Sequence, residues 1–547
     1  MLKRVLAAAA AVGVLAFAAP AAAAPDFSAE RFKAHVTFLA DDLLEGRDTG
    51  SRGHEIAARY VAAQFALMGL KPGGENGTWF QDVPMIDTTL TGAKPTLSVT
   101  GAKGAAALPH GDKAIVRGPT AGGRADVDAP AVFVGYGLQD KALGLDDYRG
   151  LDVRGKVVVV LWGVPGGLDS EIAAHLMSDQ RKVAAEHGAA GVIQVPTQSL
   201  DRIFPWAQQL QYAGTPRTNW IDKDGRPGDP GAALQFTATV ESAAATALFE
   251  GAPKTLAVLQ AAAAKGERPK GFALKTRVKA AAETTVRRFT SPEVIGIVEG
   301  ADPKLKGEYV AMMGHLDHIG MKKTGDGDRI NNGAMDNAAG VATLLEAAHA
   351  FMSEAQRPRR SVLIVANTGE EKGLLGADYF ARHPTVPADR IVAGVDLDMP
   401  VLTYDFTDVI AYGAGHSTVS QAIARAGAGM GLTLSPDPDP DQATFVRSDH
   451  YMLVRAGVPA VMLVDGYAGP GKAAWEEFNA KHYHQVSDDL SQPILWEQGA
   501  KFAKLNYLVA RDIADADEAP RWYQGDYFGD LFAPAAPKAK KSPSARP

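Results

Sequence analysis

The 547-residue sequence contains no cysteine. No disulfide can therefore stabilise the fold, and neither a thiolate metal site nor a cysteine nucleophile is available. The sequence also lacks an excess of positive charge, because 56 Lys and Arg stand against 63 Asp and Glu, for a net charge of −7. Such a balance offers no basic surface for a nucleic acid, so no nucleic-acid partner is expected. The length predicts two to four domains of a globular protein.

Beyond the N-terminus, no stretch of the sequence is apolar enough to span a bilayer. At the N-terminus, Lys3 and Arg4 precede an apolar run over residues 5–19, and small residues follow at 21–24. This pattern predicts a signal peptide cleaved after Ala23, with an uncleaved membrane anchor as the alternative. We therefore expect an exported protein, periplasmic or extracellular, without stable membrane insertion after cleavage.

Acidic and histidine side chains follow the ends of several apolar runs of the sequence. Most of them stand where a strand would give way to a loop, and the last lies further into its loop. In open α/β sheets, that edge is where ligands bind. The candidates are His315, Asp336, Glu370, Glu371, Asp398 and His484.

Two histidines with three or four carboxylates suit one or two divalent metal ions, and zinc accepts both kinds of ligand. The alternative is that these acids are ordinary surface carboxylates, but their positions after apolar runs argue against it. Four carboxylates close together repel one another by about 4 kcal/mol per pair at 4 Å and a dielectric constant near 20, so the cluster needs cations. A site for two metal ions needs one shared ligand, and Asp336 is best placed. We expect two Zn²⁺ per chain, with Co²⁺ or Mn²⁺ possible because the ligands are oxygen-rich.

Six motifs in this part of the sequence resemble, in the same order, the motifs of metallopeptidase family 28. They read GHLDHIG, NNGAMDNAAG, NTGEEKGLLGADYF, VDLDMP, RSDHYMLVRAGVP and HYHQVSDD, within about residues 285–512. That family contains two-zinc aminopeptidases, glutamate carboxypeptidase and the inactive transferrin receptor. The resemblance implies one zinc ion on His315, Asp336 and Asp398. It implies a second on Asp336, Glu371 and His484, with Glu370 as the general base and a cis bond after Asp336.

Four further residues have expected places beside this site. Asp317 can accept the free ring N–H of His315 and fix its tautomer. Tyr483 is placed to donate to a tetrahedral oxyanion, unless it is an ordinary core tyrosine. Arg447 is a candidate to bind substrate or support that tyrosine, with an ion pair to Asp449 as the alternative. His318 has no assigned role and is expected to be a packing or surface histidine.

The strands and helices predicted after residue 285 alternate, which indicates an α/β, doubly wound and largely parallel sheet. Before them, residues 96–270 are rich in short β-like runs. The stretches VFVGYGL, DVRGKVVVV and KVAAEHGAAGVIQV resemble an inserted, β-rich protease-associated domain.

Helices are expected at 54–68, 172–187 and 243–265, and the glycine-rich GRDTGSRG at 46–53 is interpreted as a turn. The predicted divisions are a signal peptide at 1–23, an N-terminal helical part of the catalytic domain at 24–95, the insert at 96–270, a two-zinc peptidase domain at 271–512, and a tail at 513–547 that is disordered at its end.

Taken together, these features predict an exopeptidase, and an aminopeptidase acting on peptides is preferred. A substrate ammonium would be drawn to Glu370 and Asp398, with the acidic loop 326–328 close by in sequence. A glutamate-type carboxypeptidase is the main alternative, but it needs arginine forks for a carboxylate, and Arg447 is the one candidate. Less favoured are a single-zinc glutaminyl cyclase, against which His315 argues, and a non-catalytic binding protein, which would have lost the ligands. The oligomeric state is left open.

Overall fold

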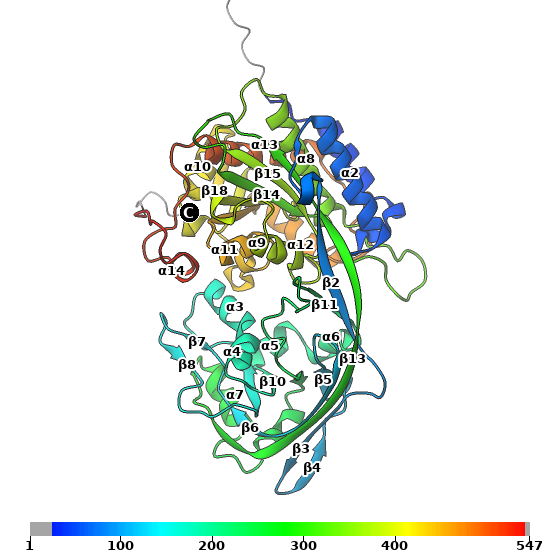
Figure 1. The fold of residues 1–547 in the computed structure, drawn as a ribbon, viewed down its shortest axis with the longest axis vertical. Helices are drawn as coiled ribbons and strands as arrows, with labels where there is room; N and C mark the ends of the chain where they lie inside the picture. The colour runs from blue at the N-terminus through cyan, green and yellow to red at the C-terminus, as the bar shows by residue number, and fades with distance from the viewer. Residues whose placement is uncertain (1–24, 542–547) are drawn as a thin grey trace, which may run out of the picture.

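The computed structural model describes residues 25–541, which form two lobes (Figure 1). The upper lobe comprises residues 25–90 and 284–541, and the lower lobe comprises residues 91–283. Two long strands, β2 (Phe80–Leu90) and β13 (Phe272–Val298), run along one side of the molecule and connect the lobes. The predicted signal peptide lies outside the described residues.

Four neighbouring strands at the centre of the upper lobe run parallel. In spatial order they are β15 (Ser361–Asn367), β14 (Tyr309–His315), β16 (Ile391–Asp396) and β19 (Ala460–Asp465). The antiparallel strands β13 and β17 (Asp408–Tyr412) flank them, and β18 (Thr433–Ser435) pairs with β17. The central strands are almost wholly apolar and buried, as strands covered on both faces must be. The largely parallel α/β sheet predicted from the sequence is confirmed.

Helices cover both faces of this sheet, and successive residues of β14 pack into different cores. Val310 and Met312 belong to one core, and Ala311 and Met313 belong to the other. The first core contains residues of α1 (Ala29–Leu39), α2 (Arg52–Met68), α8 (Ala339–Ser353), α10 (Val419–Gly429) and α13 (Trp496–Asp515). The second contains residues of α9 (Leu375–Arg382) and α11 (His450–Arg455). The α2 helix ends at Gly69 in a left-handed conformation, close to the predicted end.

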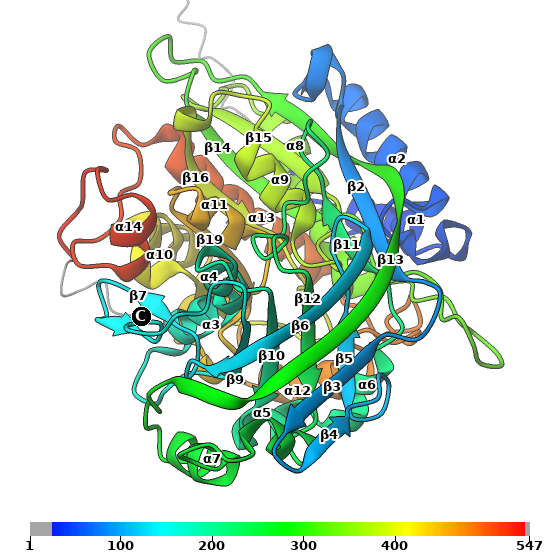
Figure 2. The same ribbon diagram turned by 60° about the horizontal axis from the view of Figure 1, so that its bottom comes forward.

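The lower lobe has a core of its own and a second set of parallel strands (Figure 2). These are β6 (Gly123–Phe133), β9 (Val157–Trp162), β10 (Gly191–Pro196) and β12 (Phe236–Val240). The strand β5 (Ala114–Arg117) runs antiparallel to β12, while β3 (Thr96–Gly101) pairs with both β13 and β4 (Gly104–Ala107). The assignment of this region as a protease-associated domain stays a prediction.

Two helices expected in the lower lobe are each divided in two. The first is split at Asp179 into α3 (Ser170–Ser178) and α4 (Gln180–Glu186), because Asp179 ends one helix and begins the next. The second consists of a 3-10 turn (Ala244–Phe249) and α7 (Leu256–Ala264). Gly251 and Pro253 separate these, and proline cannot continue the hydrogen bonds of a helix interior. The remaining strands and α-helices are β1 (Lys71–Pro72), β7 (Gln139–Asp140), β8 (Leu145–Asp146), β11 (Arg217–Trp220), α5 (Gln198–Ile203), α6 (Trp206–Gln211), α12 (Gly471–Lys481) and α14 (Tyr527–Phe532).

The C-terminal segment is ordered further than its composition suggested. Trp522 and Phe528 are buried in the second core of the upper lobe, and the backbone of Gln524 bonds to that of Ala539. These aromatic side chains fix a segment whose flanking Pro, Ala and Lys residues would not order it alone. The expected disorder therefore does not hold for residues 522–541, and residues 542–547 lie outside the described part.

Within residues 25–541, none of the helices combines the length and the apolarity that crossing a bilayer requires.

Candidate active site

The candidate residues converge at the ends of the parallel strands of the upper lobe. His315 is the last residue of β14, and Asp398 lies two residues beyond β16. Glu370 and Glu371 follow β15 after a short turn. Asp336 occupies a single π-helical turn (Ala334–Ala338) before α8, and His484 follows α12.

The distances divide these side chains into two groups that share Asp336. His315 Nε2 lies 3.1 Å from Asp398 Oδ1 and 3.4 Å from Asp336 Oδ1. His484 Nε2 lies 3.3 Å from the other Asp336 oxygen, Oδ2, and 3.2 Å from Glu371 Oε2. Ligand atoms of His315, Asp336 and Glu371 all lie within 4.8 Å of one another, close enough to hold a metal ion. One carboxylate therefore faces both groups, with one oxygen toward each.

Hydrogen bonds from the backbone of this turn to Asp488 hold Asp336 in position. The buried carboxylate of Asp488 accepts hydrogen bonds from the backbone N–H groups of Met335, at 2.9 Å, and Asp336, at 3.0 Å. The bond between Asp336 and Asn337 is cis, as the family resemblance predicts. The Asn337 side chain bonds to the carbonyl of Leu397, which lies next to Asp398. The turn carrying Asp336 is thus tied to the loop carrying Asp398.

The hydrogen-bond partner of the His315 ring N–H differs from the predicted one. Its Nδ1 lies 3.0 Å from the backbone carbonyl of Asp317, so the carbonyl takes the ring N–H and the carboxylate does not. That carboxylate instead accepts from Thr49 Oγ1, at 2.8 Å, and from the backbone N–H of Glu370, at 3.2 Å. A residue two positions along the chain reaches back more easily with its backbone than with its side chain. The carboxylate of Asp317 therefore positions Glu370 rather than His315.

His318, expected to be a packing or surface histidine, contacts the site directly. Its side chain is fully buried, and Nδ1 lies 2.6 Å from Glu371 Oε1. This contact fixes the second oxygen of a carboxylate whose first faces His484. The signal in the sequence was the His-Leu-Asp-His spacing, which places a second imidazole one short turn after the first.

The GRDTGSRG segment does more than turn the chain. The buried guanidinium of Arg47 donates to the carbonyls of Leu316, at 2.9 Å, and Asn332, at 2.6 Å. These carbonyls belong to the loops that carry His315 and Asp336, and Thr49 of the same segment supports Asp317. A signal for this role was present in the sequence. A simple turn needs glycines, but it does not need the arginine, aspartate and threonine that stand between them here.

The charged groups of the site shift one another's pKa values. Burial lowers the pKa of His315, but the carboxylates of Asp398, Glu370 and Asp336 outweigh it and raise the pKa well above its ordinary value. Burial acts against charge at His484 too, yet its bonds to Asp336 and Glu371 raise its pKa to about 10. Burial and repulsion from Glu371 and Asp398 raise the pKa of Glu370 well above the ordinary range. Carboxylates packed this densely demand positive charge, from protonated imidazoles or from metal ions.

A cavity of about 350 Å³ opens onto these residues, lined by Glu370, Asp398, His315, Tyr483 and Arg447 among others. The ring of Tyr483 stacks on His484 at 3.9 Å between centroids. Arg447 is exposed and donates to Gln442, and among the described residues it has no ion pair with Asp449. The acidic loop 326–328 does not line the cavity. Aromatic and apolar side chains complete the wall: Met399, Tyr412, Met462, Val464, Tyr467 and Trp475.

Acidic and imidazole side chains gathered at the strand ends of a doubly wound α/β sheet form a group that could hold a metal ion. Residues 293–510 match the sequence model of Peptidase family M28. This part of the chain belongs to that family, so the chain carries a metallopeptidase domain, and the resemblance seen in the six motifs is confirmed.

The chain is similar to solved structures. An aminopeptidase from Aneurinibacillus sp. strain AM-1 is 20% identical and matches with a TM-score of 0.50, covering 90% of this chain and 95% of its own. BSAP, a zinc aminopeptidase from Bacillus subtilis, is 16% identical and matches with a TM-score of 0.42 over 90% of this chain and 97% of its own.

Curated relatives match over shorter regions. A vacuolar membrane protease of Sclerotinia sclerotiorum is 28% identical over 231 residues, which cover 37% of this chain and 19% of that protein. A vacuolar membrane protease of Lodderomyces elongisporus is 31% identical over 100 residues, 18% of this chain and 9% of that protein. The chain thus matches less than a fifth of the length of either relative.

These relatives correct the location expected from the sequence. They are named as proteases of the vacuolar membrane, so the prediction of a periplasmic or extracellular location is wrong by this comparison. The physical reason is that an apolar leader specifies entry into a membrane pathway, whereas the final compartment depends on later sorting.

Proposed function

We propose that this chain is a zinc-dependent aminopeptidase that removes N-terminal residues from peptides. The proposal rests on the position of the Asp336 carboxylate, whose two oxygens face two different groups of side chains. One oxygen faces His315 and Asp398, and the other faces His484 and Glu371. A carboxylate in that position can bridge two metal ions, and no single ion would need both groups.

The donor atoms fit zinc. Imidazole nitrogens and carboxylate oxygens are common zinc ligands, and a catalytic site keeps a position open. In this proposal His315, Asp336 and Asp398 hold one ion, and Asp336, Glu371 and His484 hold the other. His318 and the carbonyl of Asp317 orient two of these ligands, as neighbours of metal ligands commonly do. When bound, zinc lowers the pKa of a water molecule and polarises a carbonyl group.

Glu370 is the proposed general base. It lines the cavity, and its backbone is fixed by Asp317, while the neighbouring Glu371 is engaged by two histidines. Glu370 is thus free to take the proton of the attacking water and to deliver it to the nitrogen of the leaving amine. Tyr483 lines the same cavity, and its O–H is proposed to donate to the oxyanion that forms at the substrate carbonyl.

The charges around the cavity favour a substrate with a free amine. Glu370, Asp398 and Asp439 line it, and an N-terminal ammonium would be attracted to them. A carboxypeptidase needs fixed cations for a terminal carboxylate, and Arg447, which is exposed and bonded to Gln442, is the one arginine of the lining. The Aneurinibacillus aminopeptidase, with the same fold, supports this choice.

The proposal is tested with a matched pair of peptides, one with a free N-terminus and one N-acetylated. The expected result is stepwise release of residues from the free N-terminus and no cleavage of the acetylated peptide. Equal cleavage of both peptides, or release from the C-terminus, contradicts the aminopeptidase assignment. Inactivity of a zinc-loaded protein toward both peptides would favour a non-catalytic binding protein.

A further inference from the structure

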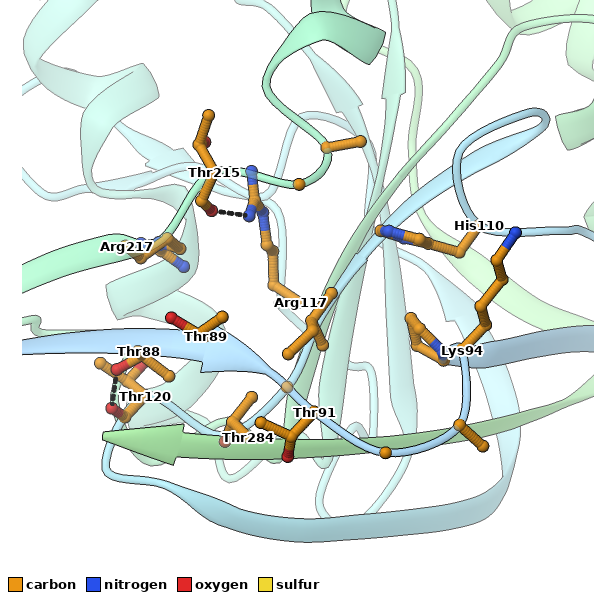
Figure 3. A pocket seen from close by; sticks show the side chains of 17 residues that line it. Thr88, Thr89, Thr91, Lys94, His110, Arg117, Thr120, Thr215, Arg217 and Thr284 are labelled. Atoms are coloured by element: carbon orange, nitrogen blue, oxygen red, sulfur yellow. Dashed lines mark hydrogen bonds between the residues drawn. The ribbon is translucent and has the colours of Figure 1, made fainter. Parts of the chain in front are cut away.

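A second cavity, of about 280 Å³, lies mainly in the lower lobe, at its border with the upper lobe, and is lined by none of the residues that line the candidate active site. It lies where β2 ends and the chain turns into residues 91–95, between the ends of β5 and β11 and beside Thr284 of β13 (Figure 3). Arg217 of β11 pairs in register with Thr88 of β2. The cavity is therefore built on the sheet itself.

The charged side chains that line this cavity are all cationic. They are Lys94, Arg117 and Arg217; His110 also lines the cavity, and no aspartate or glutamate belongs to the lining. Arg117 and His110 point into the space between these strands (Figure 3). Threonine hydroxyls make up most of the remaining polar wall.

Few carboxylates face these cations. Arg117 donates to the carbonyls of Thr215, at 2.7 Å, and Tyr212, but among the described residues neither it nor Lys94 has a carboxylate within 4.0 Å. Arg217 shares the carboxylate of Asp229 with Arg181, which lies outside the lining, at 3.6 and 3.5 Å. Glu283 lies beside Gly92 of the lining. When Arg181 is counted with the three lining cations, four cations face two carboxylates, which leaves a surplus of two positive charges in a space where charge is costly unless it is paired.

Two further features indicate that the missing partner is an acceptor of hydrogen bonds. The hydroxyl of Thr91 is buried and has no partner, although it lines the cavity. The Nδ1 of His110 accepts from the backbone N–H of Val116, so its proton is on Nε2 and available for donation. Burial lowers the pKa of His110, and repulsion from the cations Arg117 and Lys94 lowers it as well.

We propose that this cavity is a binding site for a small molecule carrying an oxyanion group, a phosphate or a pair of carboxylates, held by Arg117, Arg217, Lys94 and the hydroxyl of Thr91. The surplus of two charges suits a doubly charged group. The cavity has room beyond one such group, and Leu90, Ala93, Pro95 and Ala213 give it an apolar part. The ligand therefore has a short organic portion as well.

The test measures binding of inorganic phosphate and of succinate to the full-length, zinc-loaded protein by calorimetry at low ionic strength, where electrostatic attraction is least screened. We expect one of the two anions to bind with one site per chain in this cavity, and the stronger arm identifies phosphate or dicarboxylate chemistry. Lys94→Ala, an exposed change that carries little risk to folding, should weaken binding about tenfold, as expected for one charge-assisted contact. Arg217→Gln should weaken it further.

The matched control is Lys103→Ala, which removes an exposed lysine of the same lobe that does not line the cavity. It should leave binding unchanged, and Lys94→Ala should leave peptide hydrolysis unchanged. Anion bound at the zinc centre would be insensitive to Lys94, so it cannot imitate the expected pattern. Absence of binding by the wild type, or equal loss in Lys94→Ala and Lys103→Ala, overturns the proposal.

Discussion

The two cavities described above are built from opposite charges on one continuous sheet. In the upper lobe, carboxylates gather at the ends of parallel strands and each candidate ligand touches an imidazole. In the lower lobe, cations gather at strand ends, where Arg117 is bound by backbone carbonyls and Arg217 by a carboxylate that it shares. The acidic group demands cations and the basic group demands an anion. The contrast shows that the charge left without a partner in a cavity, more than the shape of the cavity, indicates what it binds.

The largest expected effect separates catalysis in the upper lobe from binding in the lower. Glu370→Gln should lower kcat by about 10²–10⁴-fold, because it removes the group that accepts and returns the proton. It should leave the zinc content and succinate or phosphate binding unchanged. The measurements are steady-state hydrolysis of a free-amine peptide and metal analysis. Glu371→Gln is the control next to it in the chain, and it should lose zinc; near-normal turnover of Glu370→Gln would show that another residue is the base.

Removal of metal should affect the upper lobe alone. A chelator should abolish hydrolysis and lower the unfolding temperature, since an ion at a thousand times its dissociation constant stabilises the folded state by about 4 kcal/mol. Differential scanning calorimetry with and without chelator measures this change. Zinc restored at equal concentration should return both properties. An unfolding temperature that does not move would contradict a metal site built from His315, Asp336 and Glu371.

A third prediction concerns the joint between the lobes. His416 lies between Asp526, at 2.6 Å, and Glu171 of the lower lobe, at 2.9 Å. Although burial lowers its pKa, these two carboxylates raise it to about 9. Because the folded-state pKa exceeds the unfolded value of about 6.5, the stabilisation is fully present below pH ~6.5 and is lost as the pH rises through about 9.

His416→Gln should therefore lower the free energy of unfolding by up to about 3 kcal/mol at pH 6 and by little above pH 9.5. Urea unfolding at both pH values measures the difference between wild type and variant. Glu171→Gln, which breaks only the contact to the lower lobe, should show a smaller difference with the same direction. A difference that is equal at both pH values would mean that the charge of His416 is not responsible.

The smallest expected effect concerns the GRDTGSRG segment, whose Thr49 holds Asp317 in place beside the candidate active site. Thr49→Val keeps the shape of the side chain but removes the hydroxyl that donates to Asp317. A lost hydrogen bond to a charged group costs about 1.5–3 kcal/mol at most, so a moderate fall in stability is expected. Because Asp317 also positions Glu370, kcat should fall severalfold while KM changes little. Thr49→Ser should restore kcat, and unchanged kinetics in Thr49→Val would limit the segment to a structural role.

The central sheet and most of the site could be predicted from the sequence because both depend on local patterns. The strands β14, β15, β16 and β19 are buried on both faces, so each stands out as an apolar run. The candidate ligands follow those runs within a few residues, apart from Asp336 and His484. Their convergence follows from the geometry of a parallel sheet.

What could not be predicted depends on contacts between distant segments. Arg47 and Asp488 support the site from the two ends of the chain, and no local pattern pairs them with Asp336. The cationic cavity unites residues near positions 91, 117, 217 and 284 through strand register, which a single sequence does not reveal. The hydrogen-bond partner of His315 was missed for a different reason: the carbonyl and the carboxylate of Asp317 can both accept its ring N–H, and in the structure the carboxylate is bound by Thr49 instead.

The strand β13 has a consequence for attempts to divide this protein into pieces. At roughly 3.3 Å per residue its 27 residues extend about 90 Å. Its first half pairs with β6 and β3, and its last residues pair with β15, so the border between the lobes crosses the strand and does not precede it. A fragment of residues 96–270 would leave β6 and β3 as bare edges, which are sites of aggregation. An excised fragment of this kind, or a graft of it onto another peptidase, must therefore be extended to include residues 272–284.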